Sequence, residues 1–128
     1  MNDLRILIVE DDPDSADMVQ VLLNSAGVET IVVGSAEAAL KKLETTPGVF
    51  NTLLIDLALP EMDGMELLQV IRQKPEMSRV PLIAITAYHT PELKARVLDA
   101  GFDGYFAKPL NTTFFVQALE RLVERFNA

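Results

Sequence analysis

The sequence predicts an α/β protein in which a doubly wound, five-stranded parallel sheet is covered by five helices. Short runs of branched aliphatic residues alternate with segments of helical periodicity along the chain. The aliphatic runs are apolar at consecutive positions, which is typical of strands buried on both faces in a parallel sheet. Strand–helix alternation implies right-handed crossovers. We predict the strand order 2-1-3-4-5, because it places a topological switch point between the first and third strands.

Five strands are expected in chain order. Four are rich in isoleucine, leucine and valine, and the fifth is a weaker segment containing two aromatic residues. The predicted strands cover residues 6–9, 30–33, 53–55, 82–85 and 105–107.

The first two helices have recognisable ends. Met18 and Leu22 share the apolar face of a helix that we expect to stop at Gly27. Ser35 is the predicted N-cap of a second helix, which ends before residues 47–48, a Pro-Gly pair.

Three further helices follow the third, fourth and fifth strands. One runs from about residue 65 to 72, and the next covers 92–100 with a thin apolar face and Gly101 as its terminator. A thin apolar face suits an element that shifts at low cost. Asn111 is the candidate cap of the last helix, the most regular of the five. Its apolar positions recur at +4, +3 and +4: Phe115, Leu119, Leu122 and Phe126.

Length and composition indicate one globular domain over residues 1–128. The chain has 128 residues, 49% of them hydrophobic, and a formal net charge of −8. This acidic balance argues against nucleic-acid binding, which needs clustered Lys and Arg. The absence of cysteine excludes disulfides, zinc–thiolate sites and thiol nucleophiles. No apolar run approaches the roughly 20 residues that span a bilayer, and no signal peptide is evident, so we expect a cytoplasmic protein without membrane contact.

Charged and hydroxyl side chains follow the predicted strands at their carboxyl ends. Residues 10–12 (Glu-Asp-Asp) follow the first strand, Asp56 the third, Thr86 the fourth and Lys108 the fifth. Because these ends meet at one edge of a parallel sheet, we expect the side chains to converge at the switch point.

Such a cluster suits a hard cation. Like charges within a few ångströms raise one another's pKa unless a cation lies among them, and oxygen ligands without His or Cys favour Mg²⁺. The charges of Glu10, Asp11 and Asp56 would be balanced by Mg²⁺ together with Lys108. A carboxylate in this setting can act as a nucleophile towards phosphorus.

Four segments, in this order and at these separations, resemble the receiver domain of bacterial two-component response regulators. They are residues 6–12, 54–64, 85–87 and 100–109, and the resemblance extends over essentially the whole chain. It implies a flavodoxin-like fold and a stand-alone receiver domain, without an output domain, like that of chemotaxis regulators.

The resemblance assigns a metal site. It implies that Asp56 is the phospho-acceptor, and that Asp11 and Asp56 bind Mg²⁺ directly, with Mn²⁺ as an alternative ion. Glu10 would hold a metal-bound water, and the main-chain carbonyl of Ala58 would be a further ligand.

The resemblance also assigns the switch. Thr86 and Lys108 match the family's hydroxyl and lysine, and Tyr105 matches its switch aromatic. The bond before Pro109 matches a position where the family often has a cis peptide, which would help to aim the lysine.

The expected function is a phosphorylation-controlled signalling switch that catalyses only its own phosphorylation and dephosphorylation. The expected partners are a sensor histidine kinase or a histidine phosphotransfer protein, and a downstream protein target. The target would read the surface formed by the fourth helix, the fifth strand and the fifth helix. We expect a monomer or a weak phosphorylation-dependent dimer. The charged outer face of the last helix is compatible with a dimer contact, but we expect it to face solvent.

Three alternatives are open. The chain is a phosphorylation-independent interaction module, a receiver cut from a longer hybrid kinase or regulator, or a Mg²⁺-dependent phosphatase. Haloacid-dehalogenase-type phosphatases carry a second acid two residues after the nucleophile, where this chain has Ala58, which argues against turnover.

Two positions affect the lifetime of the phosphorylated state. Ala58 cannot orient an attacking water, and Tyr88 would cover the phosphoryl group, so we predict a long-lived phosphorylated state. His89, the single histidine, is expected in an exposed loop without a chemical role.

Overall fold

The computed structural model describes residues 3–128, in which five strands alternate with five α-helices and one short 3₁₀ helix. The strands are β1 (Arg5–Val9), β2 (Glu29–Val33), β3 (Thr52–Asp56), β4 (Leu82–Thr86) and β5 (Gly104–Ala107). The helices are α1 (Pro13–Ser25), α2 (Ala36–Thr45), α3 (Gly64–Arg72), α4 (Pro91–Ala100) and α5 (Phe115–Asn127), with η1 (Pro75–Met77) after α3.

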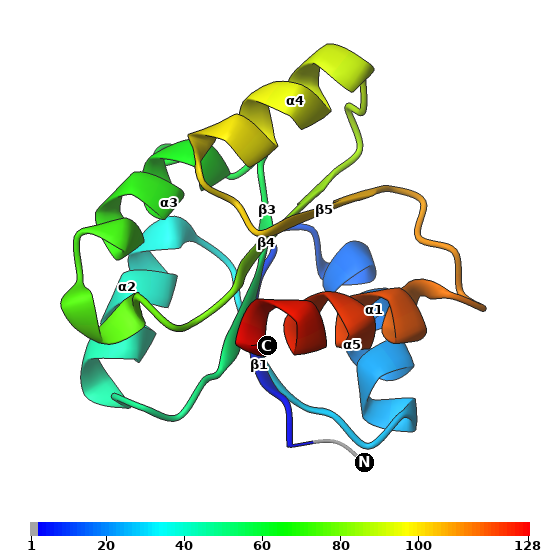
Figure 1. The fold of residues 1–128 in the computed structure, drawn as a ribbon, viewed down its shortest axis with the longest axis horizontal. Coiled ribbons are helices and arrows are strands. Elements are labelled where there is room, and N and C mark those ends of the chain that lie inside the picture. The colour runs from blue at the N-terminus through cyan, green and yellow to red at the C-terminus, as the bar shows by residue number, and fades with distance from the viewer. Residues whose placement is uncertain (1–2) are drawn as a thin grey trace.

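All neighbouring strands pair in parallel in the order β2-β1-β3-β4-β5. The predicted sheet and strand order are therefore confirmed. Helices α2, α3 and α4 lie on one side of the sheet, and α1 and α5 lie on the other (Figure 1). Because each crossover carries a helix, both faces of the central strands are covered.

The two faces of the sheet form two separate apolar cores. Leu7 and Leu53 pack in the core beneath α2, α3 and α4. Ile6, Ile8 and Leu54 pack in the core beneath α1 and α5. Side chains on a strand alternate between faces, so a strand buried on both sides is apolar at every position, as these runs are.

One predicted strand is buried less than expected. In β2 both Glu29 and Ile31 are exposed, whereas every residue of β3 and β4 is buried. The expectation of two buried faces was wrong for β2, because this strand lies at the edge of the sheet with β1 as its one neighbour.

Helix ends follow the predicted capping residues in most places. Ser35 accepts a hydrogen bond from the Ala38 N–H at the start of α2, and Gly27, just past α1, has a φ of 83°. Asn111 was a less accurate prediction. Its side chain accepts from the N–H groups of Thr113 and Phe114, and so forms the turn before α5 instead of capping the helix itself.

Within the part of the chain that the structure describes, no helix is both long and apolar enough to cross a membrane.

Candidate functional site

The predicted polar residues lie together at the carboxyl edge of the sheet. Asp56 is the last residue of β3 and is aligned with Ile85 of β4. Thr86 ends β4, and its carbonyl accepts a hydrogen bond from the Lys108 N–H at 2.8 Å. Glu10 follows β1 and donates its own N–H to the Val33 carbonyl of β2. The strand ladder thus continues into the site and holds its backbone in place.

Lys108 bridges two buried carboxylates. Its Nζ lies 2.5 Å from Glu10 Oε1 and 2.7 Å from Asp56 Oδ2. The second oxygen of each carboxylate accepts a main-chain N–H, from Asp12 to Glu10 Oε2 at 3.2 Å and from Ala58 to Asp56 Oδ1 at 2.7 Å. Glu10 and Asp56 are each only 4% exposed, so these contacts replace the water that the carboxylates lose on folding.

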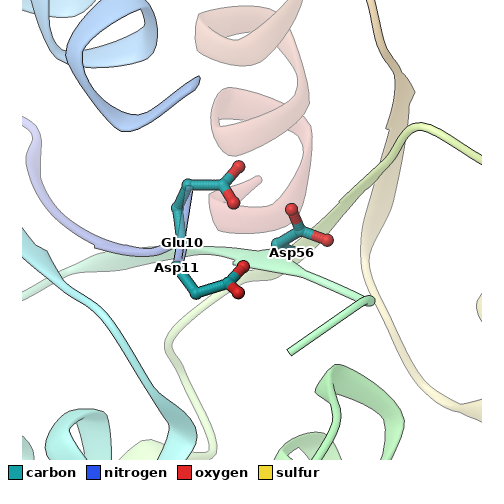
Figure 2. A group of neighbouring side chains, drawn as sticks. All are labelled: Glu10, Asp11 and Asp56. Carbon is teal, nitrogen blue, oxygen red and sulfur yellow. The ribbon is translucent and has the colours of Figure 1, made fainter. Parts of the chain in front are cut away.

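Asp11 completes a cluster of three carboxylates. Oxygen atoms of Glu10, Asp11 and Asp56 lie within 4.8 Å of one another, and the three side chains point towards a common space (Figure 2). Asp11 is exposed while the other two are buried, so the cluster opens to solvent on the Asp11 side. The hard oxygen donors, the spacing and the open side fit a Mg²⁺ ion with water ligands.

The electrostatics of the cluster also fit a cation. Burial, followed by the nearby Asp56, raises the pKa of Glu10 from 4.5 to about 7, although the hydrogen bonds from Lys108 and the Asp12 N–H act in the opposite direction. Burial alone would lower the pKa of the Lys108 ammonium, but its hydrogen bonds to Asp56 and Glu10 raise it above its ordinary value. One lysine therefore does not compensate three carboxylates, and a divalent cation would.

Thr86 and Tyr105 lie on adjacent strands next to the cluster. Thr86 is 1% exposed, and its Oγ1 accepts the Tyr88 N–H at 3.1 Å. Tyr105 lies in β5 opposite Ala84, and its ring is half-buried. Its hydroxyl lies 2.9 Å from His89 Nδ1. Burial raises the pKa of the Tyr105 hydroxyl.

His89 and Gly64 are two residues whose contacts the sequence interpretation missed. His89 is exposed, as expected, but it bonds the predicted switch residue. A Cβ on Gly64 would lie 2.6 Å from the Asp56 carbonyl oxygen and 2.8 Å from the Leu57 Cα. Gly64 therefore lets α3 start directly against the backbone of Asp56 and Leu57. Asp63 caps α3, but no local sequence pattern predicts this close approach.

The remaining predicted residues have definite positions. The Lys108–Pro109 peptide bond is cis, as predicted. Ala58 is exposed and contacts Asp56 through its N–H; its role as a carbonyl ligand stays a prediction. Tyr88 is 72% exposed, and its proposed shielding of a phosphoryl group also stays a prediction.

Comparison with known proteins agrees with this geometry. A family model described as the response regulator receiver domain matches residues 6–120. An uncharacterized 14.6 kDa protein in the sodA1 3′ region of Leptolyngbya boryana is 35% identical over 118 residues, which cover 92% of this chain and 88% of that protein. The sensor histidine kinase GacS of Pseudomonas protegens is 30% identical over 118 residues, 90% of this chain but only 13% of the kinase.

A solved structure is similar over nearly the whole chain. The receiver domain of the sensor histidine kinase PA1611 from Pseudomonas aeruginosa, which holds a magnesium ion in its active-site cleft, has a TM-score of 0.83 and 30% identity. The match covers 94% of this chain and 98% of that domain. The family match, the parallel sheet and the acidic cluster at its edge together show that this chain belongs to the response regulator receiver domain family.

Proposed function

We propose that this chain is a phosphorylation-controlled signalling switch in which Asp56 accepts a phosphoryl group from a phosphohistidine of a partner protein. The observation that carries the proposal is the pairing of Asp56 with Lys108 beside Glu10 and Asp11 in one cluster at the sheet edge. A structural role alone does not account for two buried carboxylates with oxygen atoms within 4.8 Å of each other, because their repulsion and desolvation oppose folding.

Asp11 and Asp56 would bind Mg²⁺ directly, with the Ala58 carbonyl as a further ligand, and Glu10 would hold a metal-bound water. Bound there, the ion would neutralise charge on the phosphoryl oxygens during transfer. The magnesium ion in the PA1611 receiver domain supports this assignment.

The side chains of this site have distinct tasks in the transfer. An Asp56 carboxylate oxygen attacks phosphorus and forms the new P–O bond, while the P–N bond to the donor imidazole breaks and its electron pair stays on nitrogen. Lys108, already 2.7 Å from Asp56, can pair with a phosphoryl oxygen in a charge-assisted hydrogen bond. The Ala58 N–H orients the carboxylate through its 2.7 Å bond to Oδ1.

Signalling would follow from a new partner for the Thr86 hydroxyl. This hydroxyl accepts the Tyr88 N–H in the present structure, and a phosphoryl group on Asp56 would draw it inwards. Tyr105 would then occupy the vacated space, and the surface of α4, β5 and α5 would change for a downstream protein. Near-complete switching requires about 5.5 kcal/mol of differential stabilisation.

The proposed donors are a sensor histidine kinase or a histidine phosphotransfer protein. Support comes from the related kinase GacS, of which this chain matches a short part. We propose that the chain turns over no separate substrate, because Ala58 occupies the position at which aspartyl-phosphate phosphatases carry their second acid.

The test is intact mass after incubation with Mg²⁺ and a small phosphoryl donor, either acetyl phosphate or phosphoramidate. The chain should gain one hydroxylamine-labile phosphoryl group, and Asp56→Asn should gain none. Asp99→Asn, which changes an exposed carboxylate of α4, is the matched control and should be phosphorylated like the unmodified chain.

Two results would contradict the proposal. A labile adduct that persists in Asp56→Asn would show that another residue is the acceptor. No adduct, together with no Mg²⁺ binding by calorimetry, would favour the phosphorylation-independent interaction module.

A further inference from the structure

The hydroxyl of Tyr105 is bonded to the single histidine of the chain. His89 Nδ1 lies 2.9 Å from the hydroxyl oxygen, and the two rings are 5.4 Å apart at an interplanar angle of 54°. Lys94 of α4 lies 6.0 Å from the centre of the tyrosine ring, at the outer limit of a cation–π contact. Tyr105 therefore has contacts that favour the side-chain position seen here.

The loop that carries His89 is anchored on both sides. Before it, the Tyr88 N–H donates to Thr86 Oγ1. After it, the side chain of Thr90 accepts the Leu93 N–H and caps α4. The position of His89 thus depends on the same Thr86 hydroxyl that the proposed switch requires to move.

The backbone of Tyr105 cannot follow a displacement easily. Tyr105 is aligned with Ala84 of β4, and Ala107 with Thr86, so the ring moves mainly by rotation of its own side chain. A change of the χ1 rotamer displaces the hydroxyl at the far end of the ring and so breaks its 2.9 Å contact with His89 Nδ1. The bond is therefore compatible with another rotamer of Tyr105 only if the loop moves as well.

We propose that His89 is a positioning residue that holds Tyr105 in its resting conformation and opposes the phosphorylated conformation. The inference rests on the proposed function, since it concerns the cost of that switch. The connection runs from Thr86 Oγ1 to the Tyr88 N–H, along one peptide unit to His89, and from its imidazole to the Tyr105 hydroxyl. A Thr86 hydroxyl that turns to a phosphoryl oxygen releases the Tyr88 N–H and, with it, the segment that restrains Tyr105.

The bond does not depend on one protonation state of the histidine. A neutral ring with its proton on Nε2 accepts the tyrosine O–H at Nδ1, and an imidazolium donates its Nδ1–H to the hydroxyl oxygen. We therefore assign His89 a positional task and not a pH-sensing one.

The first test measures the side-chain conformation of Tyr105 in the metal-free protein. Three-bond NMR couplings that report χ1 should show one rotamer in the unmodified chain and averaging in His89→Ala. His89→Asn keeps a polar atom near the position of Nδ1 and should restore the single rotamer. A single unchanged rotamer in His89→Ala would overturn the proposal, whatever the behaviour of the phosphorylated protein.

The second test measures the affinity for beryllofluoride, a phosphoryl mimic, in the presence of Mg²⁺. Loss of one partly exposed hydrogen bond should tighten binding by about twofold to fivefold in His89→Ala and in Tyr105→Phe. The double variant should bind no more tightly than either single one, because both remove the same bond. Unchanged or weaker binding by His89→Ala, or additive effects, would overturn the proposal.

A different result would contradict the proposed function. Unmodified protein that binds Mg²⁺ but shows no change at Thr86 or Tyr105 on saturation with beryllofluoride would contradict the switch. The coupling measurement in the metal-free protein would still decide whether His89 holds Tyr105.

Discussion

Replacing Glu10 by glutamine should stabilise the metal-free protein, and increasingly so as the pH rises. Glutamine has the shape of a protonated glutamate but cannot ionise. In the folded chain, burial and the contact with Asp56 raise the pKa of Glu10 from 4.5 to about 7. The ionised form is therefore disfavoured in the folded protein, and glutamine removes that form.

The magnitude follows from the pKa difference. Each unit of pKa difference corresponds to about 1.4 kcal/mol. Ionising Glu10 therefore costs about 3 kcal/mol more in the folded chain than in the unfolded one. Below pH 4.5 Glu10 is protonated in both the folded and the unfolded state, and its contribution to stability is fully present. That contribution is lost as the pH rises from 4.5 through the folded-state pKa of about 7. The advantage of Glu10→Gln should grow from less than about 1 kcal/mol at pH 5 to about 3 kcal/mol at pH 8.

Urea unfolding in EDTA at pH 5, 6, 7 and 8 measures this difference directly. Glu124→Gln, at an exposed position on α5, is the matched control, and its effect should stay within about 0.5 kcal/mol throughout. Adding Mg²⁺ should reduce or reverse the advantage of Glu10→Gln, because the ion stabilises the carboxylate that this variant lacks.

A free-energy difference between Glu10→Gln and the unmodified chain that is the same at pH 5 and pH 8 would refute the reasoning. It would mean that Lys108, 2.5 Å from Glu10, compensates burial and repulsion fully. The cluster would then hold no excess negative charge for a cation to neutralise.

Two predictions concern the segment from the end of β3 to the first residue of α3. Gly64→Ala should destabilise the chain by about 1–3 kcal/mol and weaken Mg²⁺ binding, because the added Cβ would meet the backbone of Asp56 and Leu57. Urea unfolding measures the stability and a Mg²⁺ titration measures the affinity. Unchanged stability and affinity would contradict the close approach. Glu61 has a φ of 62°, which costs a side-chain-bearing residue about 1–2 kcal/mol. Glu61→Gly should therefore raise the melting temperature and Glu61→Val lower it, whereas equal shifts would show that this conformation carries no strain.

The sheet and the acidic cluster were predictable because both follow from local patterns joined by one topological rule. A run such as residues 53–55 indicates a strand buried on both faces, and strand–helix alternation makes the strands parallel. Once the strands are parallel, Asp56, Thr86 and Lys108 must lie at one edge. No knowledge of side-chain conformation is needed for that step.

The features that could not be predicted depend on tertiary contacts without a local signature. The bond between His89 and Tyr105 joins residues 16 positions apart, through a loop whose path no periodicity encodes. The exposure of Ile31 follows from the edge position of β2 and not from its own aliphatic neighbours. The 3₁₀ helix η1 is three residues long, too short for a periodic pattern.

The distribution of buried contacts determines where a new charge on Asp56 can cause movement. Every residue of β3 and β4 is buried, so displacing these strands would disturb both cores at once. Helix α4 buries one residue fully, Val97, whereas α3 buries four. Elements with few buried contacts move at the lowest free-energy cost. The segment from Thr86 to α4 is therefore where the site is joined to a weakly held element, and the hydrogen bond of His89 to Tyr105 lies on that segment.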